Sequence, residues 1–332
     1  MFIRNARSHR PVSLIFIPLI AVGLWLPGFL HPAPPAPMIF MPAFGSVASW
    51  TSAWPVLNVF LGLAFTLLQA FLLNYIAQQQ QLFTRKTWLP ALMFVTFASC
   101  TPSLLTFNPE LVAGLFLLGA LYVLLSTYRM DRAHSQVFNA GFLIGLAGIF
   151  YLPSLVFFIF AIIAIIVLRP FVWREWAILF AGLLVPWIYS GVYFFWNDRI
   201  VSVTMENIYN PVVQRDFFFK LPVEYYALAF MTGMVLLTSA GRFVAGAGTS
   251  TMKTKKGVSV MVWFLVFSII AVIPAQNFAV PVFLFTVYPL SVFTSNYFLN
   301  ARRQWLADTI YLFFLASIAA TYFIKVSGLF GS

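Results

Sequence analysis

Apolar residues fall along this chain in runs of about 20, the length that crosses a bilayer core as a helix. About eleven such segments are visible, with approximate cores at residues 11–30, 55–77, 88–106, 109–127, 138–152, 153–168, 176–196, 222–241, 258–274, 279–299 and 304–324. None shows the two-residue alternation of a transmembrane β-barrel. The pattern predicts an all-α, polytopic membrane protein with a single transmembrane domain over residues 1–332. It leaves open whether residues 138–168, interrupted at Pro153, form two full spans.

The distribution of Lys and Arg predicts the orientation, because basic residues gather in short cytoplasmic loops. A cytoplasmic N-terminus places 15 of the 19 basic residues inside, and the reverse placement inverts this distribution. We therefore expect the N-terminus in the cytoplasm and the C-terminus in the periplasm, with the chain in a bacterial inner membrane. Two long outer loops then lie at about 31–54 and 197–221, and a basic cytoplasmic loop lies at about 242–257.

Composition agrees with a membrane protein. The chain is 62% hydrophobic and only 8% charged, whereas soluble domains are about 25% charged. The net charge of +11 is often a nucleic-acid signal, but cytoplasmic anchoring of the helices explains it here, so we expect no nucleic-acid partner. Cys100 is the single cysteine, and the three histidines show no metal-ligand spacing. No Walker, GxGxxG or GxSxG motif is present.

Acidic residues, of which there are eight, limit where chemistry can occur. None falls at the centre of an apolar segment, where ion-driven transporters usually place one. Glu110, in the stretch TFNPEL, begins the fourth segment on the outer face. Asn108 as N-cap, Pro109 at the first helical position and an acid in the first turn give a purely structural explanation. The functional alternative is that Glu110 faces a cavity, where a carboxylate acts as a general base, binds a divalent cation or orients a sugar.

The other candidate residues lie in or beside the outer loops. Arg199, Arg215 and Lys220 can hold a phosphate or diphosphate by charge-assisted hydrogen bonds, although exposed interfacial charges are the simpler interpretation. His31, at the exit of the first segment, is either a second catalytic candidate or an interface residue. The remaining acidic candidates of the second outer loop are Asp198, Glu206 and Asp216.

Two stretches resemble the GT-C superfamily of membrane glycosyltransferases. Residues 101–132 read TPSLLTFNPELVAGLFLLGALYVLLSTYRMDR and are similar to its third and fourth spans, where an outer turn with a polar or acidic residue leads into a Leu/Ala-rich span. Residues 138–189 are similar to the following run of short span, Pro-started span, basic turn and a span carrying a Pro-Trp pair, here Pro186 and Trp187. The run around 138–151 and the WREW turn at 173–176 resemble even more closely an uncharacterised family of integral membrane proteins from Bacteroidota.

The resemblance, over roughly residues 10–200, implies a substrate cavity at the outer membrane surface. For an active member it implies transfer of a sugar from a polyprenyl-phosphate donor to a lipid, glycan or protein acceptor. The superfamily's catalytic acid normally lies in the first outer loop, but residues 31–54 contain no Asp or Glu. Glu110 matches a second acidic position of the superfamily.

The expected function is therefore that of a GT-C-like inner-membrane protein of cell-envelope glycan or lipid-linked sugar metabolism. An enzyme of this kind has a membrane lipid or a polyprenyl-phosphate sugar as its partner. The alternative is a non-catalytic scaffold or assembly subunit that packs against a partner membrane protein. A facilitator for an apolar or lipid substrate is a third interpretation.

Overall fold

The computed structural model describes residues 12–32, 53–83, 85–101, 104–170, 172–205, 251–272, 283–300 and 304–327, and a few isolated positions (6, 43–45, 50, 51 and 233). Within these residues the chain forms helices and no strand, which confirms the all-α prediction. The helices are α2 Val12–Leu30, α4 Pro55–Gln79, α5 Leu89–Ala98, α6 Pro109–Ser126, α7 His134–Phe150, the 3-10 helix η2 Leu152–Val156, α8 Phe157–Leu168, α9 Trp173–Trp196, α10 Ile200–Thr204, α13 Met252–Ile270, α14 Leu284–Leu299 and α15 Gln304–Ser327.

Four of the described helices are long and apolar enough to cross a membrane, namely α2 (from Ser13), α4, α6 and α9. Such helices are the mark of a membrane protein, because about 20 apolar residues span the bilayer core. The predicted segment at 222–241 lies outside the described residues, apart from position 233.

Two helix boundaries differ from the apolar pattern, and one expected break is confirmed. The helix predicted over 88–106 ends at Ala98, and Pro102 disfavours helical backbone just before it, so the helix does not continue to 106. The interruption expected at Pro153 is found close by, because extended backbone at Tyr151 separates α7 from η2 and α8, and neither half reaches the length of a full span. The basic loop predicted to end at 257 becomes helical from Met252, after the Thr251 hydroxyl caps the amide of Thr254.

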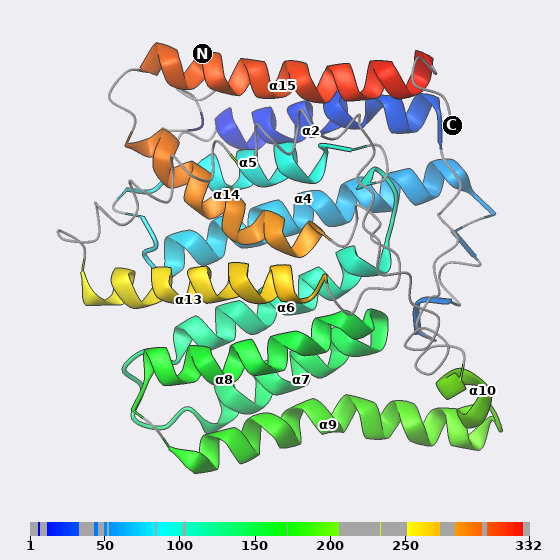
Figure 1. Cartoon of the computed structure of the whole chain (residues 1–332), viewed down its shortest axis with the longest axis vertical. Coiled ribbons are helices and arrows are strands. Elements are labelled where there is room, and N and C mark those ends of the chain that lie inside the picture. Colours follow the sequence, from blue (N-terminus) through cyan, green and yellow to red (C-terminus); the bar gives the residue numbers. More distant parts are fainter. Residues whose placement is uncertain are drawn as a thin grey trace.

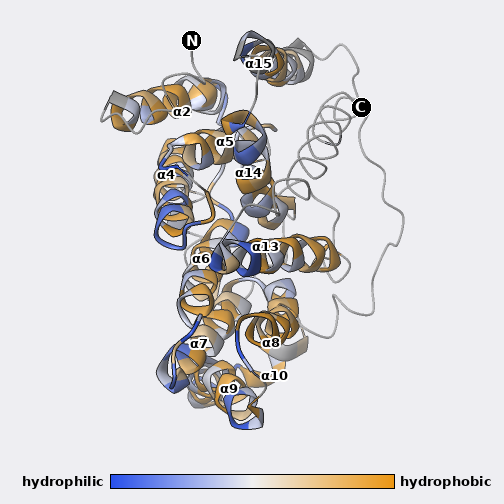
Figure 2. Ribbon diagram, turned by 90° about the vertical axis from the view of Figure 1, so that its left-hand side faces the viewer, coloured by the Kyte–Doolittle hydropathy of each residue, from blue (hydrophilic) through white to orange (hydrophobic). Residues whose placement is uncertain are grey.

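The helices lie side by side, and their chain directions alternate between many neighbours (Figure 1). Seen nearly end-on, α4, α6 and α7 lie in one row, and α14, α13 and α8 lie in a second row beside it (Figure 2). Helices α2 and α9 lie near opposite edges, and only 22% and 17% of their apolar windows are buried, against 67% for α6. Helix α6 is therefore central, and its first turn, which carries Glu110, lies inside the protein.

Helices α7 and α9 pack with their backbones in close contact through glycines. A Cβ atom on Gly141 would lie 2.1 Å from the carbonyl oxygen of Leu179, and one on Gly182 would lie 2.3 Å from that of Phe138. Glycine at these positions lets the two helices approach as small residues do in membrane helix pairs. Any larger residue has to push the helices apart.

Candidate functional site

Glu110 lies in the first turn of α6, as the sequence predicts, with Pro109 at the start of the helix. Asn108 has the extended backbone of an N-cap, but its side chain does not cap the helix. Its Oδ1 instead accepts a hydrogen bond of 2.8 Å from the Thr106 hydroxyl. The Glu110 side chain is buried, with a relative exposure of 1%. Helix capping therefore explains only part of this turn.

Four buried polar atoms near this turn have no hydrogen-bond partner among the described residues: Glu110 Oε2, Asn58 Nδ2, Asn108 Nδ2 and the Tyr151 hydroxyl. We call these four residues the Glu110 cluster. The Asn58 Oδ1 accepts a 2.9 Å bond from the amide of Phe107, which ties α4 to this turn. Tyr151 lies within electrostatic range of the Glu110 carboxylate. A buried polar atom without a partner costs about 1–3 kcal/mol, so the cluster has the character of a site for water or a polar ligand.

Aromatic side chains cover the start of α6. Phe107 lies 5.5 Å from Phe44 and 5.0 Å from Phe65, measured between ring centroids, and Phe116 stacks on Phe150 at 5.6 Å. Phe44 belongs to the segment predicted as the first outer loop, and it packs against Phe107 in one small apolar group. Phe44 and Phe107 therefore form an apolar contact next to the start of α6.

A polar contact between three helices supports the site at Leu111, the residue after Glu110 in α6. The Gln69 amide of α4 donates to the carbonyl oxygen of Leu111, and the Tyr288 hydroxyl of α14 donates to Gln69 Oε1 at 2.8 Å. Tyr288 is held by stacking on Phe94, with 5.2 Å between the ring centroids. A Cβ atom on Gly114 would lie 1.9 Å from the Tyr288 hydroxyl, so a larger residue there would displace this hydroxyl. This arrangement fixes the backbone next to Glu110.

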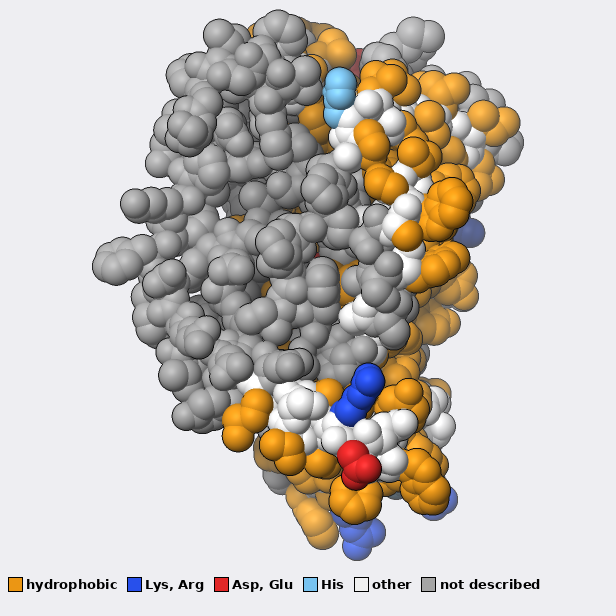
Figure 3. Space-filling view, turned by 90° about the vertical axis from the view of Figure 1, so that its right-hand side faces the viewer, with side chains coloured by type: hydrophobic (Ala, Val, Ile, Leu, Met, Phe, Trp, Pro, Cys, Tyr) orange, Lys and Arg blue, Asp and Glu red, His pale blue; other side chains and the backbone are white. Residues whose placement is uncertain are grey.

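The structure does not bring the other predicted site residues to Glu110. His31 is exposed at the end of α2, and Asp198 and Arg199 are exposed between α9 and α10. Helices α2 and α9 lie near opposite edges (Figure 1), and no hydrogen bond or ion pair joins these three residues to Glu110 within the described ranges. Hydrophobic side chains dominate the described part of the face shown in Figure 3, and charged ones are few. The remaining predicted residues, outside the described ranges, are Glu206, Arg215, Asp216 and Lys220.

The Glu110 cluster does not fit the divalent cation considered from the sequence. Hard cations take several oxygen ligands, often from more than one carboxylate. Glu110 is the single carboxylate of the cluster, and the side-chain oxygens of Asn58 and Asn108 already accept hydrogen bonds. Among the described residues no three His, Cys, Asp or Glu side chains gather as a metal site.

Three members of the cluster are not predicted as site residues from the sequence, where ionisable residues are the first candidates. Asn58 is a single amide in the apolar run PVLNVFLG, and a buried amide within a membrane helix is a recognisable signal. Local pattern explains Asn108 as a helix cap and places Tyr151 in an apolar segment. Tyr151 faces the cluster only because the chain breaks between α7 and η2.

The fold and this cluster define an all-helical membrane protein with a buried carboxylate at one end of its central helix. The chain belongs to DUF6427, a family of unknown function, whose model matches residues 39–330. No curated protein and no solved structure matches the chain.

Proposed function

We propose that the protein is a GT-C-like, multi-pass inner-membrane protein of cell-envelope glycan or lipid-linked sugar metabolism, with the Glu110 cluster as its site. The observation that supports this most is the buried Glu110 side chain, because one of its carboxylate oxygens, two amide nitrogens and a phenol around the first turn of α6 have no hydrogen-bond partner among the described residues. A group of this composition suits a sugar, because amides and a carboxylate together match hydroxyl groups that both donate and accept. The resemblance of residues 101–132 to GT-C spans points the same way.

The proposed reaction is transfer of a sugar from a polyprenyl phosphate to an acceptor hydroxyl. The Glu110 carboxylate takes the proton of the acceptor hydroxyl as a general base. The acceptor oxygen then bonds to C1 of the sugar, the bond between C1 and the phosphate oxygen breaks, and polyprenyl phosphate leaves with the electron pair. Asn58 and Asn108 donate their free amide N–H groups to the sugar, and Tyr151 orients it through its hydroxyl.

The orientation expected from the basic residues puts the Glu110 cluster on the periplasmic side, where lipid-linked sugars are used. The Glu110 side chain is only 1% exposed, so an active enzyme has to open the packing around the start of α6 before a sugar reaches it. This requirement separates the two functional candidates, since a scaffold needs no such opening.

A transfer assay tests the proposal. Purified protein in proteoliposomes is given polyprenyl-phosphate hexoses with a radiolabelled sugar, and membrane lipid extract supplies the acceptor. We expect wild type to transfer label and Glu110→Gln to lose transfer while remaining monodisperse, since glutamine has the same shape. Asp131→Asn, which removes an exposed acid far from the cluster, is the matched control and should transfer normally. Equal transfer by Glu110→Gln and wild type refutes the role of Glu110.

The second candidate is a non-catalytic scaffold that packs against a partner membrane protein. The packing of Phe44 on Phe107, just before the start of α6, favours it, together with the absence of acidic residues from 31–54. Cross-linking in native membranes distinguishes the two candidates. A scaffold is recovered with one partner in a fixed ratio, this ratio is unchanged by Glu110→Gln, and no transfer is detected.

A further inference from the structure

A second site lies at the end of the bundle opposite the Glu110 cluster. A cavity of about 270 Å³ is lined by residues of three segments, namely Tyr128–Met130 after α6, Leu168–Pro170 at the end of α8, and Met252 and Lys256 of α13. We call it the basic pocket. It lies about 27 Å from the cluster, given the separation along α6 between Glu110 and Tyr128 and the 1.5 Å rise of each helical residue. The two sites are therefore independent.

The basic pocket has an excess of positive charge. Its lining holds the cationic side chains of Arg129, Arg169 and Lys256 and no acidic side chain. Arg169 is neutralised by Glu175, with 2.9 Å between its Nη2 and the carboxylate. Arg129 and Lys256 both lie over the ring of Tyr128, at 5.4 and 5.6 Å from its centroid. Neither has an ion-pair partner in the part of the chain that the structure describes, so two cations share one ring without a counter-ion.

The backbone of Arg129 is unusual for its residue type. Its φ of 59° lies in the left-handed region, which disfavours a residue with a Cβ atom and which glycine adopts readily. Glycine is the common residue just after a helix for this reason. An arginine here places a guanidinium over Tyr128 despite the strain. Backbone strain of this kind is often found at ligand sites.

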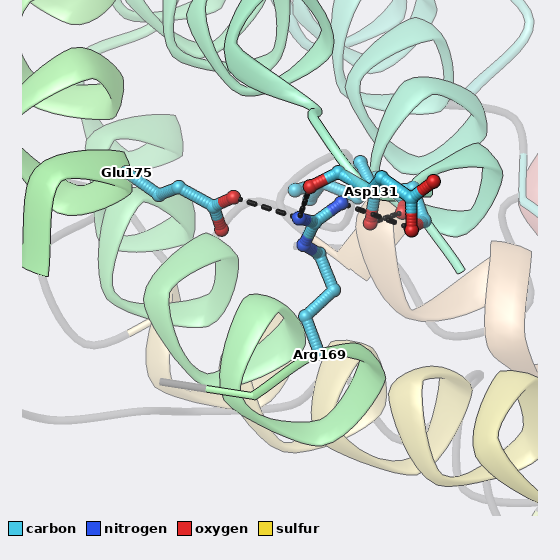
Figure 4. A network of polar contacts seen from close by, with 5 residues as sticks. Asp131, Arg169 and Glu175 are labelled. Carbon is cyan, nitrogen blue, oxygen red and sulfur yellow. Dashed lines mark hydrogen bonds and ion pairs between the residues drawn. The ribbon is translucent and has the colours of Figure 1, made fainter. Parts of the chain in front are cut away.

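Arg169 fixes the turn that carries Arg129. Its Nη1 donates to the carbonyl oxygen of Thr127 and its Nη2 to that of Asp131, both at 3.4 Å. Figure 4 shows the guanidinium lying between Glu175 on one side and the turn with Asp131 on the other. Because Arg169 is 8% exposed and bonded to this turn on one side and Glu175 on the other, it positions the pocket rather than supplying free charge.

We propose that the basic pocket binds a phosphate group through Arg129 and Lys256, either as the headgroup of an anionic lipid or as a soluble phosphate. Lys256 Nζ donates to the carbonyl oxygen of Leu168 at 3.2 Å, and its remaining N–H groups are left for a ligand. The start of α13 adds the positive end of a helix dipole. With the N-terminus in the cytoplasm, the pocket lies at the cytoplasmic surface, where basic pockets between membrane helices bind phosphate headgroups.

Binding to the purified full-length protein tests the proposal. The protein is placed in phosphatidylcholine nanodiscs and titrated with short-chain phosphatidylglycerol or with inorganic phosphate, and binding is followed by melting temperature and native mass spectrometry. Arg129→Gln and Lys256→Gln should each weaken binding about fivefold, the effect of one basic residue near a charged headgroup. Lys255→Gln is the matched control, because Lys255 lies next to Lys256 on α13 but does not line the pocket. It should change binding less than about twofold.

The two ligands separate the two sources of the phosphate. Saturable binding of phosphatidylglycerol without competition from inorganic phosphate assigns the pocket to lipid, and competition by millimolar phosphate assigns it to a soluble phosphate. Either result supports the site if only the pocket variants weaken it. An equal loss in Lys255→Gln attributes binding to general surface charge and overturns the proposal, as does the absence of saturable binding by both ligands.

Discussion

Replacing Gly182 with alanine tests the backbone contact between α7 and α9. The new Cβ atom would lie 2.3 Å from the carbonyl oxygen of Phe138, whereas a normal carbon–oxygen contact is about 3.3–3.6 Å. The obstacle is backbone and cannot rotate away, so the helices have to separate by about 1 Å. A Cβ atom on Gly191, on the same helix, would have nothing within 4 Å of it, so this position provides the matched control.

The two substitutions have opposite expected effects on the free energy of unfolding. Alanine is favoured over glycine inside a helix by about 0.8–1.0 kcal/mol, and Gly191→Ala should gain up to this amount. Overpacking costs about 1–3 kcal/mol, and a rigid backbone obstacle puts Gly182→Ala near the upper limit, for a net loss of about 2 kcal/mol. The variants should therefore differ by about 3 kcal/mol, which is more than a hundredfold in the unfolding equilibrium.

Thermal unfolding of the detergent-solubilised protein, followed by size-exclusion chromatography of the remaining native fraction, measures this difference. We expect Gly182→Ala to melt below wild type and Gly191→Ala at or above it, with a gap on the order of 5 °C. If the two variants melt together, α7 and α9 do not pack through Gly182, and the reasoning about their contact is wrong.

Two further substitutions test the buried polar contacts. Arg169→Ala should destabilise the fold by about 3–5 kcal/mol because it leaves the Glu175 carboxylate buried without its partner, the side chains of the pair being 7% and 2% exposed. A double Arg169→Met/Glu175→Leu variant should recover most of this loss in the same thermal assay, and no recovery would contradict a buried ion pair between the two residues. Tyr288→Phe should cost about 1–2 kcal/mol because Gln69 Oε1 loses its donor, whereas Tyr189→Phe, at a tyrosine that is 75% exposed, should melt as wild type does.

Much of the helical arrangement could be predicted from apolar patterning. The segments predicted at 109–127 and 176–196 correspond to Pro109–Ser126 and Trp173–Trp196. Runs of about 20 apolar residues mark such helices because this length spans the bilayer core. Hydropathy alone does not show where a helix ends within an apolar run. The short α5 ends before Pro102 although the apolar run continues to 106, whereas Pro153 marks the break that the structure has at Tyr151.

The candidate site was predictable only in part. The position of Glu110 at the start of a helix followed from the residues Asn-Pro-Glu, but its partners depend on tertiary contacts. Asn58 comes from α4 and Tyr151 from the α7–η2 junction, and no local spacing links them. Arg169 and Glu175 likewise show no sequence pattern that links them, whereas the structure buries them as a pair.

Photo-cross-linking tests most directly the claim that the Glu110 cluster receives a lipid-linked sugar. A polyprenyl-phosphate sugar with a diazirine on the sugar is irradiated with the protein in proteoliposomes, and the labelled peptides are identified by mass spectrometry. We predict labelling of peptides that contain 104–111 and Asn58, in competition with the unlabelled polyprenyl-phosphate sugar and reduced by Glu110→Gln. Labelling confined to the exposed surfaces of α2 and α9, or to the basic pocket, would contradict the proposed function.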